Sequence, residues 1–102
     1  MSKHTKGPWQ ILPEEADKDY IRIRGTVCGG RYKVANVPTP TYAGVHPREL
    51  AETCANAALI AAAPELLAAL ENIINAYDAP NKSLAAPIAD ARKARSKAKC
   101  SE

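Results

Sequence analysis

The spacing of the apolar residues changes near residue 45, and this change constrains the fold more than any other feature of the sequence. Before it, apolar and polar residues alternate in short runs, as in half-buried β-strands. After it, apolar residues recur every three or four positions, as on one face of a helix. We therefore predict an α+β fold, in which an N-terminal three-stranded antiparallel sheet is followed by two or three C-terminal helices. The 102 residues suffice for a single domain over 1–102, with a β-sheet half at 1–45 and a helical half at 46–102.

Three short runs are the predicted strands of the sheet. The first covers residues 8–12, and the other two cover residues 20–28 and 31–37. Gly29 and Gly30 separate the last two runs. A two-residue glycine loop between extended runs is typical of a β-hairpin, because its favoured turns need positive φ angles.

The register of this hairpin sorts its side chains onto two faces. Arg24 pairs with Ala35 if the two glycines form the loop, and every second residue of a strand then shares a face. One face is apolar and consists of Ile21, Ile23, Val27, Tyr32 and Val34. The other face is basic and consists of Arg22, Arg24, Arg31 and Lys33. A register shifted by one residue would turn arginines into the core, so we expect this sorting.

The basic face has two interpretations. As an ordinary outer face, its cations are solvated and protect the sheet from pairing with another edge. As a binding platform, they hold phosphate or another anion, since close like charges repel one another until an anion neutralises them. The chain has a second basic region at 82–102, where Arg92 and Arg95 are the cations expected to close the site.

Three segments of the second half have helical periodicity. Residues 48–62 place apolar residues four apart on one face, and residues 65–77 form the best amphipathic stripe in the sequence. Pro64 separates the two segments, because proline disfavours helix at the residue before it and suits the first turn of the next helix. Residues 88–99 are basic and have little apolar weight, so they predict either a marginal helix or a frayed tail.

The interior of the predicted fold is short of large side chains. The sequence has one Trp, four Tyr and no Phe, so Leu, Ile, Val and many Ala must fill the core. An alanine-rich core is thin, and small chains with thin cores commonly gain stability by association. We therefore expect a homo-oligomer.

The sequence offers little for catalysis or metal binding. It has no nucleophile motif, phosphate-binding glycine loop or cluster of metal ligands, so we expect a protein without enzymatic activity, cofactor or metal. The three cysteines, Cys28, Cys54 and Cys100, are too widely spaced to indicate a zinc site or a secreted disulfide framework. No apolar run has the length of a membrane helix, and the N-terminus has no signal-peptide pattern. We expect a cytoplasmic protein with reduced thiols and no membrane partner, in which Cys54 is an inert core thiol.

Two stretches resemble a widespread group of small phage and prophage proteins. The first is His-Thr-Lys-Gly-Pro-Trp at 4–9, and the second is Asn-Ala-Ala-Leu-Ile-Ala-Ala-Ala-Pro-Glu-Leu-Leu at 56–67. In that group, a GPW start leads through a glycine-turn hairpin to an NAxLIAAAPELL helical segment and a weakly basic last helix. The resemblance implies a phage or prophage origin.

The order of a sheet followed by two C-terminal helices is also similar to that of the Thoeris anti-defence sponges. Those phage oligomers sequester cyclic nucleotide immune signals without cleaving them, and none of their binding residues can be placed on this sequence. The resemblance implies a non-enzymatic anti-defence protein of the host bacterial cytoplasm that binds an anionic nucleotide. In this interpretation the ligand-binding residues are Arg22, Arg24, Arg31, Lys33, Arg92 and Arg95.

Two alternative functions remain open. The chain is a protein-binding inhibitor of a host defence complex, as anti-CRISPR proteins are, if its acidic helical region or its basic face docks on another protein. It is a nucleic-acid-binding accessory protein of a phage if the basic regions contact DNA or RNA. The net charge of only +3 and the lack of a cluster of aromatic residues for stacking argue against the last alternative.

Overall fold

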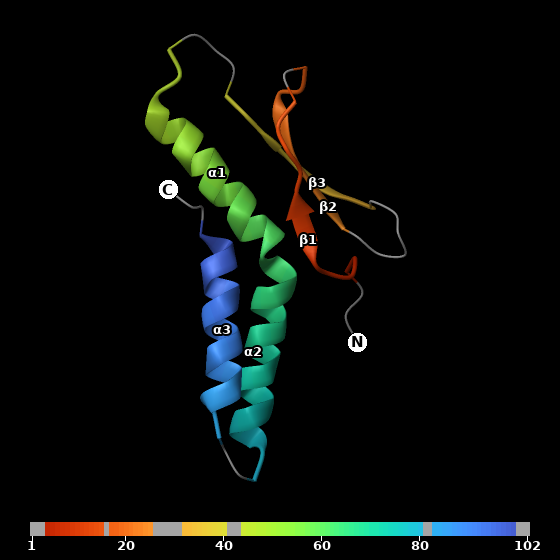
Figure 1. The fold of residues 1–102 in the computed structure, drawn as a ribbon, viewed down its shortest axis with the longest axis vertical. Helices are drawn as coiled ribbons and strands as arrows, with labels where there is room; N and C mark the ends of the chain where they lie inside the picture. The colour runs from red at the N-terminus through yellow and green to blue at the C-terminus, as the bar shows by residue number, and fades with distance from the viewer. Residues whose placement is uncertain (1–3, 16, 26–31, 41–43, 81–82, 100–102) are drawn as a thin grey trace.

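The chain folds into a small sheet followed by three helices (Figure 1). The computed structural model describes residues 4–15, 17–25, 32–40, 44–80 and 83–99. Its elements are β1 (Trp9–Ile11), β2 (Tyr20–Gly25), β3 (Tyr32–Pro38), α1 (Pro47–Ala61), α2 (Ala63–Asp78) and α3 (Ala85–Ala98). The predicted α+β class is confirmed, and the basic C-terminal segment forms a helix rather than a frayed tail.

The three strands form one antiparallel sheet in the order β1-β2-β3. The register between β2 and β3 differs from the prediction, because Arg24 lies opposite Lys33 and Ile23 lies opposite Ala35. The register shifts between Ile23 and Arg24, so β3 carries one extra residue, Val34, in a β-bulge. The bulge breaks the strict alternation of faces, and Val34 and Ala35 both pack against the core although they are neighbours in the chain.

The predicted loop of the hairpin lies outside the described residues. Gly29, Gly30, Cys28 and Arg31 all fall within residues 26–31, so the predicted turn and the pairing of Cys28 with Arg31 stay predictions. The part of the hairpin that is described extends from Tyr20 opposite Pro38 to Gly25 opposite Tyr32.

The core lies between the sheet and α1. Ile21, Ile23 and Val37 of the central and edge strands pack against Ala57 and Ala61 of the helix. Small alanine side chains let the helix backbone approach the sheet closely, and the branched side chains then fill the space between them. Ile23 is the one large side chain that is completely buried among the described residues, so the core is as thin as the composition predicts.

Two prolines set where the first two helices begin. His46 caps α1, since its Nδ1 atom accepts a hydrogen bond of 3.0 Å from the backbone N–H of Arg48, and Pro47 occupies the first helical position. Pro64 lies in the first turn of α2, where its missing N–H interrupts the backbone hydrogen bonds that would continue α1. The two helices therefore meet at a bend of 52°.

The bend divides the molecule into a body and an arm. The body is the sheet with α1, and the arm is formed by α2 and α3, which lie side by side and extend away from the sheet (Figure 1). The molecule measures 58 × 32 × 17 Å and has a radius of gyration of 16.4 Å. A compact domain of this length has a radius of gyration of about 13 Å, so the arm makes the chain markedly elongated.

Cys54 differs from the prediction for the thiols. It is half-buried on α1, and it is disulfide-bonded rather than a free, inert thiol. The two other cysteines, Cys28 and Cys100, lie outside the described residues. The expectation of a reduced Cys54 is therefore wrong, whereas the cytoplasmic location stays a prediction.

Candidate functional site

Arg24 lies inside the sheet rather than on an open basic face. Only 7% of its surface is exposed, and its Nη1 atom donates hydrogen bonds to the carbonyl oxygens of Ile23 at 2.9 Å and Ala35 at 3.1 Å. These carbonyls belong to the bulge, where the register shift removes the regular pairing of backbone groups. Arg24 therefore stabilises the irregular part of the sheet.

Arg22 is engaged by the loop between β1 and β2. Its Nη2 atom lies 2.7 Å from the Oε1 atom of Glu15 and donates a hydrogen bond of 3.0 Å to the carbonyl oxygen of Pro13. Lys18 lies 3.6 Å from the other oxygen of the same carboxylate. The charge of Arg22 is thus neutralised by a partner of its own chain, and the side chain ties the loop to β2.

The structure differs from the predicted basic platform, in which alternate residues of the hairpin place their cations on one open face. Lys33 is exposed on β3, but Arg24 is buried and Arg22 is ion-paired. Arg31 lies outside the described residues. The prediction that these cations share one open face is therefore wrong at Arg24, because the β-bulge and the local carbonyl groups override the simple pattern of two faces.

The cations of α3 are placed differently from those of the sheet. Arg92, Arg95 and Lys99 are all exposed. The spacing of three residues brings Arg92 and Arg95 to one side of α3, and Lys99 follows the helix as its C-cap. No side-chain hydrogen bond or ion pair joins any of the three to another described residue. We call Arg92, Arg95 and Lys99 the basic row, and it contains both arginines that the sequence predicts for the C-terminal region.

A groove of about 410 Å³ runs between α2 and α3. It is lined by the small side chains of Ala68, Ala69 and Ala94 and by the polar side chains of Glu65, Asn72, Asp90, Lys93 and Lys97. No role for Lys93 and Lys97 was predicted from the sequence. Their spacing of four residues was the available signal, since it places both on one side of the helix, away from the basic row.

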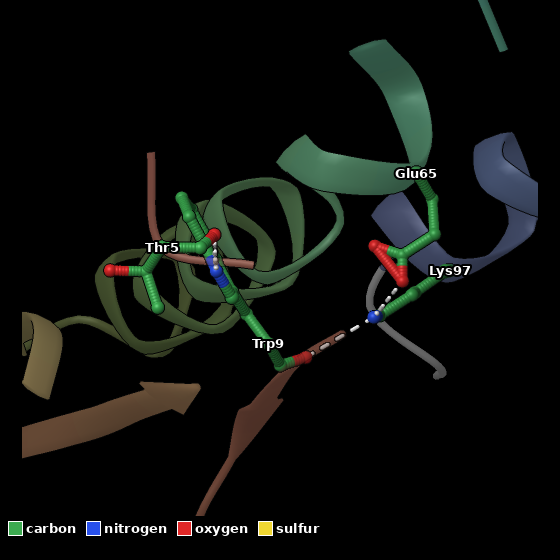
Figure 2. Close-up of polar contacts among 4 residues, drawn as sticks. All are labelled: Thr5, Trp9, Glu65 and Lys97. Carbon is green, nitrogen blue, oxygen red and sulfur yellow. Dashed lines mark hydrogen bonds and ion pairs between the residues drawn. The ribbon is translucent and has the colours of Figure 1, made fainter. Parts of the chain in front are cut away.

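Lys97 joins the arm to the body (Figure 2). Its Nζ atom lies 2.6 Å from the Oε2 atom of Glu65 on α2 and donates a hydrogen bond of 3.1 Å to the carbonyl oxygen of Trp9 on β1. The indole N–H of Trp9 in turn donates a hydrogen bond of 3.0 Å to the carbonyl oxygen of Thr5. One lysine thus connects the last helix, the second helix and the first strand.

The two stretches that carry the phage resemblance meet at this junction. Gly7 of the first stretch lies against Pro64 of the second, so closely that a Cβ atom on Gly7 would lie 2.8 Å from the Cβ atom of Pro64. Trp9 and Glu65 are bridged by Lys97 in the same region. The Oε1 atom of Glu65 is buried and has no hydrogen-bond partner in the described part of the chain. The two stretches therefore hold the arm on the body, which is a structural role.

Large apolar side chains are exposed along α2. Leu67, Leu70, Ile74 and Tyr77 have 39%, 59%, 58% and 64% of their surfaces exposed. Their spacing of three, four and three residues places them on one side of the helix. We call these four residues the apolar stripe.

The described part of the chain contains neither a metal site nor a single membrane-spanning helix. No group of three or more His, Cys, Asp or Glu side chains within it is placed to hold a metal ion. No single helix there is long and apolar enough to cross a membrane, and α1 and α2 reach that length and apolarity only together, as a bent pair. The basic row and the apolar stripe are therefore two candidate binding surfaces of the arm.

The fold and these surfaces define a small α+β protein with a sheet-and-helix body and a projecting two-helix arm. The chain belongs to the phage protein family described as Salmonella phage P22 protein Y8K6, whose model matches residues 1–102. No curated protein and no solved structure matched it. The predicted phage origin is confirmed, and the similarity to the Thoeris sponges stays a prediction.

Proposed function

We propose that this phage protein is a non-enzymatic binding protein that captures an anionic nucleotide and thereby works against host defence. The ligand class is a phosphate-bearing immune signal such as a cyclic nucleotide. The observation that carries the proposal is the basic row of α3, in which Arg92, Arg95 and Lys99 are exposed together without an ion-pair partner among the described residues. The phage family of the chain supports an action inside a bacterial host.

The chemistry of the basic row suits phosphate better than that of the sheet cations. Residues three or four positions apart on a helix have Cβ atoms about 5–6 Å apart, so two guanidinium groups of the row can reach one phosphodiester. Each guanidinium can donate two parallel hydrogen bonds to phosphate oxygens. Arg22 cannot do this without losing Glu15, and Arg24 cannot do it without leaving the sheet.

The groove between α2 and α3 lies on the other side of α3 from the basic row and is lined in part by Glu65 and Asp90, so it has no part in the proposed site. In the proposed mechanism, the basic row binds the phosphate of the ligand. The ligand is held without chemical change, which lowers the concentration of free signal.

The test is thermal unfolding of the full chain with a panel of cyclic nucleotides. A ligand at 100 times its dissociation constant adds about 2.7 kcal/mol to the free energy of unfolding, so the unfolding temperature should rise by several degrees. Arg92→Ala with Arg95→Ala should abolish this rise. The matched control, Lys33→Ala with Arg48→Ala, also removes two exposed cations but should keep it. The absence of a rise with every nucleotide of the panel would overturn the proposal.

A second candidate function is inhibition of a host defence complex by direct protein binding. The apolar stripe favours it, because exposed Leu, Ile and Tyr side chains are typical of protein contacts. Retention of one defence complex by the wild-type chain, lost in Ile74→Glu and independent of nucleotide, would favour this candidate. Retention on DNA that falls steeply with salt would instead favour the nucleic-acid alternative.

A further inference from the structure

The disulfide bond of Cys54 has one of two partners in the chain. The sequence has three cysteines, so Cys28 and Cys100 are the two candidates. Both lie outside the described residues, and we therefore infer the partner from the described residues that precede each of them. The Cα atoms of two bonded cysteines are about 4.4–6.8 Å apart, and this short reach separates the two candidates.

Cys28 follows the end of β2 that is far from Cys54. Cys54 lines a cavity of about 340 Å³ together with Tyr20 and Ile21, where β2 begins. Gly25, the last residue of β2, lies about 13 Å further along the strand than Ile21. Cys28 comes three residues after Gly25, and three residues span at most about 11 Å. A bond from Cys28 to Cys54 therefore requires these residues to turn straight back along β2.

Cys100 follows residues that already lie against α1. The end of α3 lies beside α1 (Figure 1), and Lys97 lines a hollow with Ala58 and Ala61 of α1. Ala58 is one helical turn, about 6 Å, from Cys54 and lies on the same side of α1. In Figure 1, α1 runs downward and α3 runs upward, so the direction of α3 leads from Ala58 towards Cys54. Cys100 comes only three residues after Lys97, which brings Cys54 within its reach.

We propose that Cys54 is bonded to Cys100 and that this disulfide is a redox-sensitive latch between the body and the arm. The latch joins α1 of the body to the end of α3 of the arm. The noncovalent links between the two regions are the contacts of Lys97 and the close approach of Gly7 to Pro64. When the latch is open, these noncovalent links hold the arm alone. The latch goes beyond the proposed function, because its state does not depend on a nucleotide.

The latch opens by exchange with a low-molecular-weight thiol such as glutathione. Cys54 is half-buried and lines a cavity at the surface, so a small thiolate can approach its sulfur. The thiolate attacks the disulfide, forms a mixed disulfide with one cysteine and releases the other cysteine as a thiolate. A second small thiolate attacks the mixed disulfide. The products are two protein thiols, which take two protons from water, and one small disulfide, which carries away the oxidation. The reverse exchange with the small disulfide closes the latch.

The first test maps the bond in the full chain. The chain is purified without a reductant, its free thiols are alkylated, and it is then digested with trypsin. Cleavage after lysine and arginine places the three cysteines in separate peptides, which are residues 25–31, 49–82 and 100–102. Mass spectrometry should find 49–82 linked to 100–102, and Cys28 alkylated. A link between 25–31 and 49–82 would overturn the proposal, as would an alkylated Cys54.

The second test is thermal unfolding with and without an excess of reduced glutathione, in the absence of nucleotide. The wild-type chain should unfold at a temperature lower by roughly 10 °C with the thiol, because the open latch frees a long loop in the unfolded chain. Cys100→Ser should unfold at the lower temperature in both conditions. Cys28→Ser is the matched control and should respond to glutathione as the wild type does.

Two results of the second test would overturn the proposal. One is a wild-type chain whose unfolding temperature does not change with glutathione, since the bond would then not be a switch. The other is a response that is lost in Cys28→Ser and kept in Cys100→Ser. Neither result affects the proposed function, which is tested by the response to nucleotide.

Discussion

The body and the arm use the same kinds of side chain in opposite ways. In the body, branched aliphatic residues are buried under α1, and both described arginines of the sheet are held by carbonyl or carboxylate oxygens of the same chain. In the arm, alanines fill the helix contact, while large aliphatic residues and two arginines are exposed. We therefore assign the stability of the fold to the body and the proposed binding to the arm. Four predictions test this division.

The largest expected effect is in the core of the body. Ile23→Ala should lower the free energy of unfolding by about 3 kcal/mol, because Ile23 is completely buried and the thin core cannot collapse around the cavity. Urea denaturation measures the loss. Leu59→Ala, at an exposed position, should change the free energy by less than about 0.5 kcal/mol. Equal losses in the two variants would contradict the placement of the core.

The second prediction concerns the buried cation of the sheet. Arg24→Met should lower the free energy of unfolding by about 2 kcal/mol, since the carbonyl oxygens of Ile23 and Ala35 lose a charged donor. Lys33→Met is the matched control, because Lys33 lies opposite Arg24 in the register and is exposed. It should have little effect on stability. An unchanged free energy of unfolding in Arg24→Met would contradict the role of Arg24 in stabilising the sheet.

The third prediction tests the junction between the two regions. Lys97→Met should cost about 1 kcal/mol of unfolding free energy, a modest value because the ion pair with Glu65 is about one-third exposed. A double-mutant cycle with Glu65→Gln should give a coupling of about 0.5 kcal/mol. Lys93→Met is the control, since Lys93 is exposed and lies on the same helix. A coupling of zero would mean that the contact does not hold the arm on the body.

The smallest effect on stability is expected in the basic row. Arg92→Ala with Arg95→Ala should change the free energy of unfolding by less than about 0.5 kcal/mol, because neither side chain has a partner among the described residues. Urea denaturation without ligand measures this free energy of unfolding. A loss as large as that of Arg24→Met would mean that the row serves the fold rather than binding.

Much of the fold follows from the sequence because the relevant signals are local. The alternation of residues before residue 45, the change of period there and Pro64 predict the strands, the helical half and the separation of α1 from α2. The register of β2 and β3 could not be predicted in the same way. Val34 and Ala35 are both apolar, so the sequence does not show which residue the bulge inserts.

The candidate site was predictable only in part, because solvent exposure depends on tertiary contacts. The alternation of side chains along a strand predicts the same face for Arg22 and Arg24. Their partners differ, because that of Arg22 comes from the preceding loop and that of Arg24 from the neighbouring strand. Arg92 and Arg95 are exposed because none of the described elements packs on their side of α3, which the helical period alone does not reveal. The amphipathic pattern at 65–77 predicts an apolar face on this helix. It does not predict that α3 leaves the apolar stripe exposed to solvent.

The division between body and arm is tested most directly by one set of thermal unfolding curves, recorded with and without the cyclic nucleotide that gives the largest rise for the wild-type chain. Arg24→Met should unfold at a lower temperature and keep the ligand-dependent rise. Arg92→Ala with Arg95→Ala should unfold at the wild-type temperature and lose the rise. The reverse pattern, with the rise lost in Arg24→Met and kept in the arm variant, would contradict the account and return the binding site to the sheet.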